Sequence, residues 1–277
     1  MTKKYVLIVG LLISLIATPL FANLSYDVEL KGSSSPEVKV STSILYQMPL
    51  LQGNDMFTQN NNLKLKATLG VSPITATFDL KAIFTPAAFA EISAGGTLGT
   101  GWNISEDLKG SLINRSGIVE DKLFGKLFTK GHGGVALQFD TAAFLKSKWQ
   151  SIFARVYQEV SYQTLQTADN DMWNFESSGY REKGGFYHAE YIVGYNMPII
   201  VNKVALMLET DINNFGSTLK TPILLTLSAI ANLEVMDGLN ITIIGQFTDK
   251  NNEDTSKATQ KGPFGFSKVA GIVKYNF

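Results

Sequence analysis

The strongest constraint in the sequence is a period-two alternation of apolar and polar residues, which is the pattern of a β-strand with two different faces. In residues 239–248 the odd positions are Leu, Ile, Ile, Gly and Phe, and the even positions are Asn, Thr, Ile, Gln and Thr. Residues 223–235 alternate in the same way, and the Met-Asp-Gly link at 236–238 has the composition of a tight turn. The chain is therefore expected to be all-β, with consecutive antiparallel strands.

Along the whole chain the alternation predicts about twelve strands. They lie near residues 24–31, 37–47, 62–70, 74–84, 87–98, 134–144, 151–164, 186–197, 203–211, 223–235, 239–248 and 266–277. An even count brings both ends of the chain to one side and puts the longer links on the other side, at 99–132, 166–185, 213–221 and 249–263. Ten strands are an alternative, because residues 50–61 form a long, loop-like link on the side where a short turn is expected.

Every charge in these strands can be placed on one face, and the opposite face carries none. Gln158 is a neutral polar exception on the apolar face, and we expect it near a membrane boundary. Alternation alone does not say which face is outside, since a soluble barrel or sandwich buries the apolar face in its core. A transmembrane barrel has the reverse arrangement, with apolar residues in lipid and charges in the lumen.

Two further features favour the transmembrane barrel. Several predicted strands exceed the five or six residues usual in soluble proteins and match the roughly 9 to 11 that cross hydrocarbon at a tilt. Aromatic residues gather toward the ends of the apolar rows, as in the girdles at the two membrane surfaces. They are Tyr46, Phe84, Tyr187, Tyr195, Phe247 and Tyr275. The expected fold is thus a transmembrane antiparallel up-and-down β-barrel.

The amino-terminal segment indicates export. Lys3 and Lys4 precede an apolar run over residues 5–21 that closes at Ala22, which is the pattern of a signal peptide. We therefore expect a signal peptide at 1–22 and one barrel domain at 23–277.

The carboxyl terminus carries a family resemblance. Val269, Val273, Tyr275 and the terminal Phe277 lie on one face of the last predicted strand. This resembles the terminal strand of Gram-negative-type outer-membrane β-barrel proteins, in which such a row acts as an assembly signal. The resemblance implies a location in the cell outer membrane, among its lipids, and periplasmic chaperones and the barrel-assembly machinery as partners. Residues 99–104 and 194–198 are also similar to uncharacterised spirochaetal outer-membrane barrels.

The charge and the residue composition argue against several classes of function. The formal net charge is zero, so nothing predicts binding to nucleic acid, which depends on cationic contacts to phosphates. The chain has no cysteine, which removes disulfides, thiolate nucleophiles and cysteine-ligated zinc. Residues 169–171 with Glu176 are acidic but lack the full spacing of a calcium loop. No cofactor and no metal site is therefore expected.

The inward charges define candidate pore-lining residues. They are Lys39, Lys64, Lys66, Lys81, Arg155, Glu159, His188, Glu190, Glu209, Asp211, Glu234, Lys268 and Lys274. The early strands carry mostly lysines and the later ones mostly acids, so the lumen has either a transverse field that selects among solutes or internal salt bridges that fill it. We expect a narrow porin-like channel for small hydrophilic solutes, with a structural or surface-interaction barrel as the alternative.

An enzyme is the third hypothesis. His188, with Glu190 on the same face and Glu209 and Asp211 on the next strand, offers a histidine and carboxylate pair for activating water, similar to that of omptin proteases. No serine follows two residues after His188, where a barrel phospholipase has its nucleophile, so we expect no enzyme.

The link at 99–132 also contains apolar residues at helical spacing. Val119, Leu123, Phe124, Leu127 and Phe128 recur at helical spacing, and Lys122, Lys126 and Lys130 form a basic row beside them. The pattern predicts an amphipathic helix at the pore mouth or on lipid headgroups, with a surface loop as the alternative.

Overall fold

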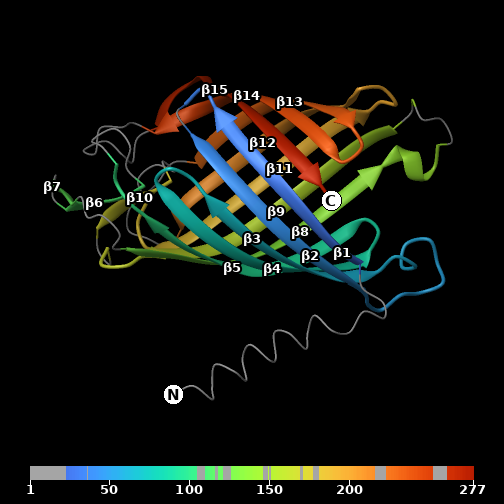
Figure 1. The fold of residues 1–277 in the computed structure, drawn as a ribbon, viewed down its shortest axis with the longest axis horizontal. Coiled ribbons are helices and arrows are strands. Elements are labelled where there is room, and N and C mark those ends of the chain that lie inside the picture. Colours follow the sequence, from blue (N-terminus) through green and yellow to red (C-terminus); the bar gives the residue numbers. More distant parts are fainter. Residues whose placement is uncertain are drawn as a thin grey trace, which may run out of the picture.

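The computed structural model describes residues 23–35, 37–104, 110–115, 118–120, 126–145, 149, 151–168, 171–176, 181–215, 223–251 and 261–277. Twelve strands form a closed barrel in which neighbours in the chain are neighbours in the sheet (Figure 1). They are β1 (Asn23–Ser33), β2 (Val38–Pro49), β3 (Asn62–Val71), β4 (Thr75–Ala87), β5 (Ala90–Gly101), β8 (Leu127–Asp140), β9 (Ser151–Leu165), β11 (Gly184–Asn196), β12 (Val201–Phe215), β13 (Ile223–Met236), β14 (Leu239–Asn251) and β15 (Lys261–Asn276). The prediction of twelve strands is confirmed, and the predicted signal peptide at 1–22 lies outside the described residues.

The first and last strands close the barrel. β1 pairs antiparallel with β15, with Val28 opposite Tyr275, and the Phe277 amide donates to the Tyr26 carbonyl at 2.9 Å. Closure pairs the two edges that an open sheet would leave free, and each unpaired backbone group in lipid would cost several kcal/mol. In the part of the chain that the structure describes, no helix is long and apolar enough to cross a membrane.

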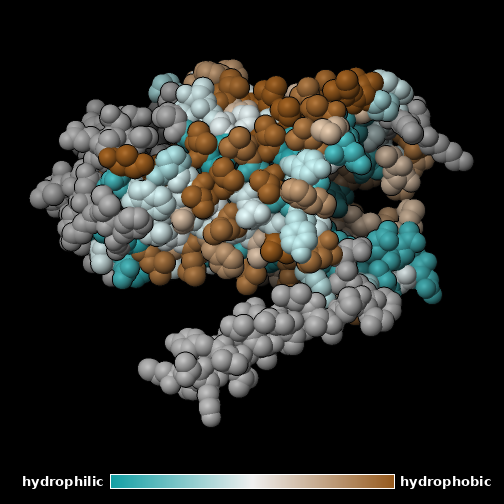
Figure 2. Space-filling model, in the orientation of Figure 1, coloured by the Kyte–Doolittle hydropathy of each residue, from teal (hydrophilic) through white to brown (hydrophobic). Residues whose placement is uncertain are grey.

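Apolar side chains cover the outer surface of the barrel. Leu30, Leu80, Leu206 and Ile243 are each about half exposed on their outward rows, and apolar residues occupy much of the side wall in Figure 2. An aqueous protein does not leave so much apolar surface exposed, whereas lipid favours it. The apolar faces therefore point outward, as a transmembrane barrel requires.

Gln158 lies at the middle of the fifteen-residue β9, exposed on the outer face between Val135 of β8 and Ala189 of β11. Its place near a membrane boundary stays a prediction.

The two ends of the barrel differ in their links. The end with both barrel termini carries the links at 50–61, 88–89, 141–150, 197–200 and 237–238, and the opposite end carries the longer predicted links. At 141–150 a short 3-10 helix, Thr141–Ala143, begins where the Asp140 carboxylate accepts the Ala142 amide hydrogen. The strands run further into the longer links than predicted: β8 begins at Leu127, β12 ends at Phe215 and β14 ends at Asn251.

The 50–61 link is a folded loop at the terminal end. The Asp55 carboxylate accepts hydrogen bonds from the Thr58 hydroxyl and the Phe57 amide, and these bonds lower its pKa from the ordinary value. The Phe57 carbonyl accepts the Ala88 amide hydrogen at 2.8 Å, and its ring packs edge-on against Phe89 at 5.8 Å. The loop is therefore long because it packs on the turn between β4 and β5. The ten-strand alternative is wrong.

Three short strands lie at the opposite end of the barrel: β6 (Ser111–Arg115), β7 (Ile118–Glu120) and β10 (Met172–Phe175). They form a separate sheet in the order β10-β6-β7, seen at the left of Figure 1.

The amphipathic helix predicted over this region is wrong in its described part. Leu127, Phe128 and Lys130 belong to β8, where they pair with β5 and β9, and Val119 lies in β7. Pairing on both edges satisfies the backbone of β8 within the barrel, which outweighs the helical spacing of its side chains. Residues 122–124 lie outside the described part.

Candidate functional site

The lumen is the candidate site, because the strands carry the predicted pore-lining residues on the face opposite to the outward apolar rows. These residues are Lys39 on β2, Lys64 and Lys66 on β3, Lys81 on β4, Arg155 and Glu159 on β9, His188 and Glu190 on β11, Glu209 and Asp211 on β12, Glu234 on β13, and Lys268 and Lys274 on β15.

A network of polar groups joins β4, β8 and β9 inside the barrel. Glu159 accepts hydrogen bonds from Lys130 Nζ at 2.6 Å and from the Tyr157 hydroxyl at 2.7 Å. His132 lies between two carboxylates, with its ring nitrogens 3.3 Å from Asp79 and 3.5 Å from Glu159. The opposite charges of Lys130 and Glu159 compensate each other for their loss of water. Part of the lumen charge is thus held in internal ion pairs.

Glycines on the wall make room for the large inward side chains. A Cβ atom on Gly95 of β5 would lie 2.8 Å from Nε2 of His132, and one on Gly134 of β8 would lie 2.7 Å from the hydroxyl of Tyr157. Both distances are too short for real atoms. His132 and Tyr157 therefore lie flat over glycines of the next strand, along the wall and not across the lumen.

Further pairs lie toward the two ends of the barrel. They are Lys64–Glu91 at 3.4 Å, Lys268–Glu37 at 2.9 Å, Lys274–Asp27 at 3.4 Å, and Glu234 with the Asn202 amide at 3.0 Å. These side chains are partly solvated, so each pair contributes little to stability.

Like charges remain side by side on two walls. The cross-strand pairs are Lys31–Lys39, Lys66–Lys81 and Glu190–Glu209. In the ring, β2 and β11 are separated by five strands in either direction, and so are β3 and β12. The lysine pairs on β1–β4 therefore lie on the side of the ring opposite to the glutamate pair on β11 and β12. This arrangement has the geometry of the predicted transverse field.

The structure brings His188 together with its predicted acidic partners. His188 Nδ1 lies 2.8 Å from Asp211 and Nε2 lies 3.2 Å from Glu190, while Glu209 lies opposite Glu190 in register. Both ring nitrogens thus face carboxylate oxygens, and the ring keeps no free lone pair with which to take a proton from water. The arrangement does not favour a histidine general base.

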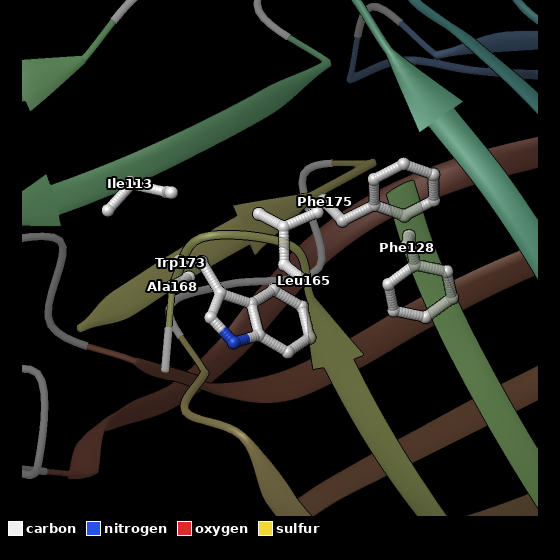
Figure 3. Packing of buried hydrophobic residues seen from close by; sticks show 6 residues of the cluster. All are labelled: Ile113, Phe128, Leu165, Ala168, Trp173 and Phe175. Carbon is white, nitrogen blue, oxygen red and sulfur yellow. The ribbon is translucent and has the colours of Figure 1, made fainter. Parts of the chain in front are cut away.

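A buried apolar cluster lies in the mouth at the end opposite the termini. It joins Phe128 of β8 and Leu165 of β9 to Ile113 of β6 and to Trp173 and Phe175 of β10 (Figure 3). The rings of Phe128 and Phe175 are stacked at 4.4 Å, and Trp173 packs edge-on against Phe128 at 5.8 Å. This cluster, which we name the mouth cluster, attaches the short sheet to the inner wall.

Glu176 connects the short sheet to the barrel wall at β2 and β4. Its carboxylate accepts hydrogen bonds from Lys39 Nζ of β2 at 2.8 Å and from the Thr75 hydroxyl of β4 at 2.7 Å. Its backbone φ of 55° is a left-handed conformation that is uncommon for a residue with a side chain. The ring of Phe175, next to it, covers Gly99 of β5. The segment 175–176 therefore crosses the mouth.

The described residues line two cavities inside the barrel. One of about 390 Å³ lies under the crossing segment and is lined by Lys39, Asp79, Lys130, Gln163 and Glu176 among others. The other, of about 820 Å³, opens at the terminal end, and its lining includes Phe57, Gln138, Asp140, Arg155 and Lys203. The charged network around Glu159 lies between these two ends of the lumen.

The sequence does not predict three of these groups as lumen residues. Its helical spacing places Lys130 in a helix and its link at 99–132 includes His132, although Phe128, Lys130 and His132 alternate with the outward residues of the same strand. Glu176 stands out in the sequence only as part of an acidic run. Its contact with Lys39 spans 137 positions of the chain, and no local pattern encodes such a contact.

No protein-family model matches the chain, and no curated protein matches it. Among solved structures it is similar to the KdgM porin, with 9% identity, 91% of this chain and 99% of that chain covered, and a TM-score of 0.44. It is also similar to the beta domain of the Bordetella autotransporter BrkA, with 8% identity, 93% of this chain and 99% of that chain covered, and a TM-score of 0.42. A third similar structure is the translocator domain of the autotransporter NalP from Neisseria meningitidis, with 8% identity, 97% of this chain and 92% of that chain covered, and a TM-score of 0.41. Likeness at this level assigns no function.

The architecture itself fixes the class of protein. A closed antiparallel barrel of an even number of strands with an apolar outer surface is the form of outer-membrane barrels. The chain is an outer-membrane β-barrel.

Proposed function

We propose that the barrel is a narrow porin-like channel for small hydrophilic solutes. The observation that carries the proposal is the pair of like-charged walls, Lys66–Lys81 on one side and Glu190–Glu209 on the other. Like charges directly opposite each other destabilise a sheet, so their presence calls for a gain elsewhere. His188 and Arg155 contact Glu190 and offset part of its repulsion of Glu209. A channel uses the charge that remains on the walls to attract and orient solutes.

The wall glycines support the same proposal. Because His132 and Tyr157 lie flat over Gly95 and Gly134, bulky inward residues leave space near the axis. The transverse field between the two walls favours dipolar solutes that carry both signs of charge, and the crossing segment at Glu176 limits their size.

Single-channel recording in planar bilayers with the purified full chain tests the proposal. We expect discrete conductance steps in the wild type. The double variant Lys66→Gln/Lys81→Gln removes positive charge from one wall and shifts the reversal potential in a salt gradient toward cation selectivity. Glu209→Gln shifts it in the opposite direction. Gly131→Ala is the matched control, since this glycine has no atom within 4 Å of an added Cβ, and it leaves conductance and selectivity unchanged.

The alternative is a structural or surface-interaction barrel. It predicts a folded, heat-modifiable protein that inserts into the bilayer and gives no conductance steps under any salt. That result overturns the channel. If the barrel conducts but the charge variants of both walls leave its ion selectivity unchanged, the transverse field has no role in selection.

The carboxyl-terminal row supports a proposal about assembly partners. Val269, Val273, Tyr275 and Phe277 all lie exposed on the outer side of the last strand, where an assembly machine and its chaperones have access to them before closure. We expect Phe277→Ala to lower the amount of barrel assembled in cells, with unchanged folding of the purified chain into detergent. Equal losses in both assays overturn this role.

A further inference from the structure

We propose that His188, Glu190 and Glu209 form a divalent transition-metal site on the lumen wall, of the type that binds Zn²⁺. The three side chains offer an imidazole nitrogen and two carboxylate oxygens, and these atoms all lie within 4.8 Å of one another. Small side-chain rotations bring such atoms to the 2.0–2.2 Å typical of zinc ligands. The set leaves a fourth position for water, toward the lumen.

The register of the sheet builds the site. His188 lies opposite Asp211, and Glu190 lies opposite Glu209, in adjacent rows of β11 and β12. The two glutamates therefore face each other as like charges at a fixed cross-strand spacing. A divalent cation between them turns this repulsion into attraction.

The residues that contact the proposed ligands, Asp211 and Arg155, are also arranged for metal binding. Asp211 contacts Nδ1 of His188 at 2.8 Å, which fixes the ring so that Nε2 points at Glu190. A carboxylate on the far nitrogen of a histidine is the usual second partner of a metal-bound imidazole. Arg155 contacts the other oxygen of Glu190, Oε2, at 3.4 Å, so that Oε1 remains directed at Nε2.

His132 shows what distinguishes the site. This histidine also lies between two carboxylates, but its Nε2 faces Asp79 and its Nδ1 faces Glu159, on opposite sides of the ring. Its partners diverge, whereas Nε2 of His188 and the two glutamates converge. His132 therefore lacks a converging set of ligand atoms and is the matched control for His188.

The chemistry of binding is an exchange of a proton for a metal ion. In the metal-free protein both nitrogens of His188 face carboxylates, which requires a proton on each. Zn²⁺ takes the place of the proton on Nε2, and that proton leaves to solvent. Charged neighbours on the adjacent strands are Glu159 and Arg155 of β9 and Asp211 of β12.

Equilibrium dialysis of the purified full chain in detergent against Zn²⁺, with elemental analysis, tests the site. We expect one saturable equivalent per barrel in the wild type and in His132→Ala. His188→Ala and Glu209→Gln abolish this equivalent, and Asp211→Asn weakens it by roughly 10- to 100-fold, as outer partners of metal sites do. No saturable Zn²⁺ in the wild type, or equal binding in His188→Ala, overturns the proposal.

A measurement on the wild type alone covers the case in which a variant fails to fold. The chain has two histidines, so ¹⁵N NMR of histidine-labelled protein follows the ring nitrogens of both. Zn²⁺ shifts the ring-nitrogen signals of His188 and leaves those of His132 unchanged. An equal change at both histidines, or at neither, overturns the site. Neither assay depends on conductance, so a barrel without a conducting pore leaves the metal site untouched.

Discussion

The carboxylate of Glu176, on the link between β9 and β11, lies 2.8 Å from the ammonium group of Lys39 on β2. The bond joins two walls of the barrel that are not neighbours in the ring, and it does so at the mouth above the smaller cavity. The crossing segment thus has a charged contact on one side and the apolar mouth cluster on the other. It is fixed at both ends.

Removing the charge of Glu176 is expected to open the mouth. Glu176→Gln keeps the size of the side chain and loses the ion pair, which at this partial exposure contributes up to about 1 kcal/mol. A change of that size shifts the balance between closed and open mouth by up to about five-fold. Single-channel recordings should show longer open times. Glu91→Gln, which breaks the Lys64 pair at the terminal end, is the control and should leave open times unchanged.

The strands were predictable because their signal is local. Alternation along 239–248 needs only the neighbours of each residue, and the structure has β14 over Leu239–Asn251. The loop at 50–61 is not predictable in this way, since its packing on the turn at Ala88 depends on a contact far along the chain.

The features that the sequence did not predict correctly depend on contacts between distant parts of the chain. Leu127 and Phe128 fit a helical stripe as well as a strand, and pairing with β5 and β9 decided between them. The contact between Glu176 and Lys39 follows from barrel closure, which no single strand encodes.

Truncating the mouth cluster is expected to release the short sheet and leave the barrel folded. Trp173 is fully buried, and Trp→Ala changes at such sites cost about 3–5 kcal/mol. The barrel strands keep their own backbone pairing, so the loss is confined to β6, β7 and β10. Limited proteolysis should cut Trp173→Ala within residues 110–115 or 171–176 and leave the wild type uncut there.

The heat-modifiable gel shift distinguishes local from global loss in that experiment. We expect an unchanged shift for Trp173→Ala. Loss of the shift means that the mouth cluster supports the whole barrel, which contradicts the expectation.

A side chain at Gly95 is expected to displace His132 from the wall. The added Cβ lies 2.8 Å from His132 and 2.6 Å from the Leu80 carbonyl, so Gly95→Val must move backbone as well as the ring. Overpacking of this kind costs typically about 1–3 kcal/mol. Urea unfolding in detergent or lipid should show the loss. Gly131→Val is the control, because nothing lies within 4 Å of its added Cβ, and a comparable loss there would refute the steric explanation.

A charge on the outer face of β12 is expected to destabilise the inserted barrel. Leu208 lies at the middle of β12 on the outward row, exposed where lipid covers it. Arginine at the bilayer midplane of such barrels costs about 2–4 kcal/mol, so Leu208→Arg should lower the free energy of unfolding from lipid vesicles by this amount. Met207→Lys, one residue away, points its charge into the lumen, where water and the acids of β11 and β12 accommodate it. The two variants should therefore differ by most of that penalty. If both destabilise equally, or if Leu208→Arg is harmless in lipid, the outer face does not contact hydrocarbon, and the barrel's apolar rows would need another partner.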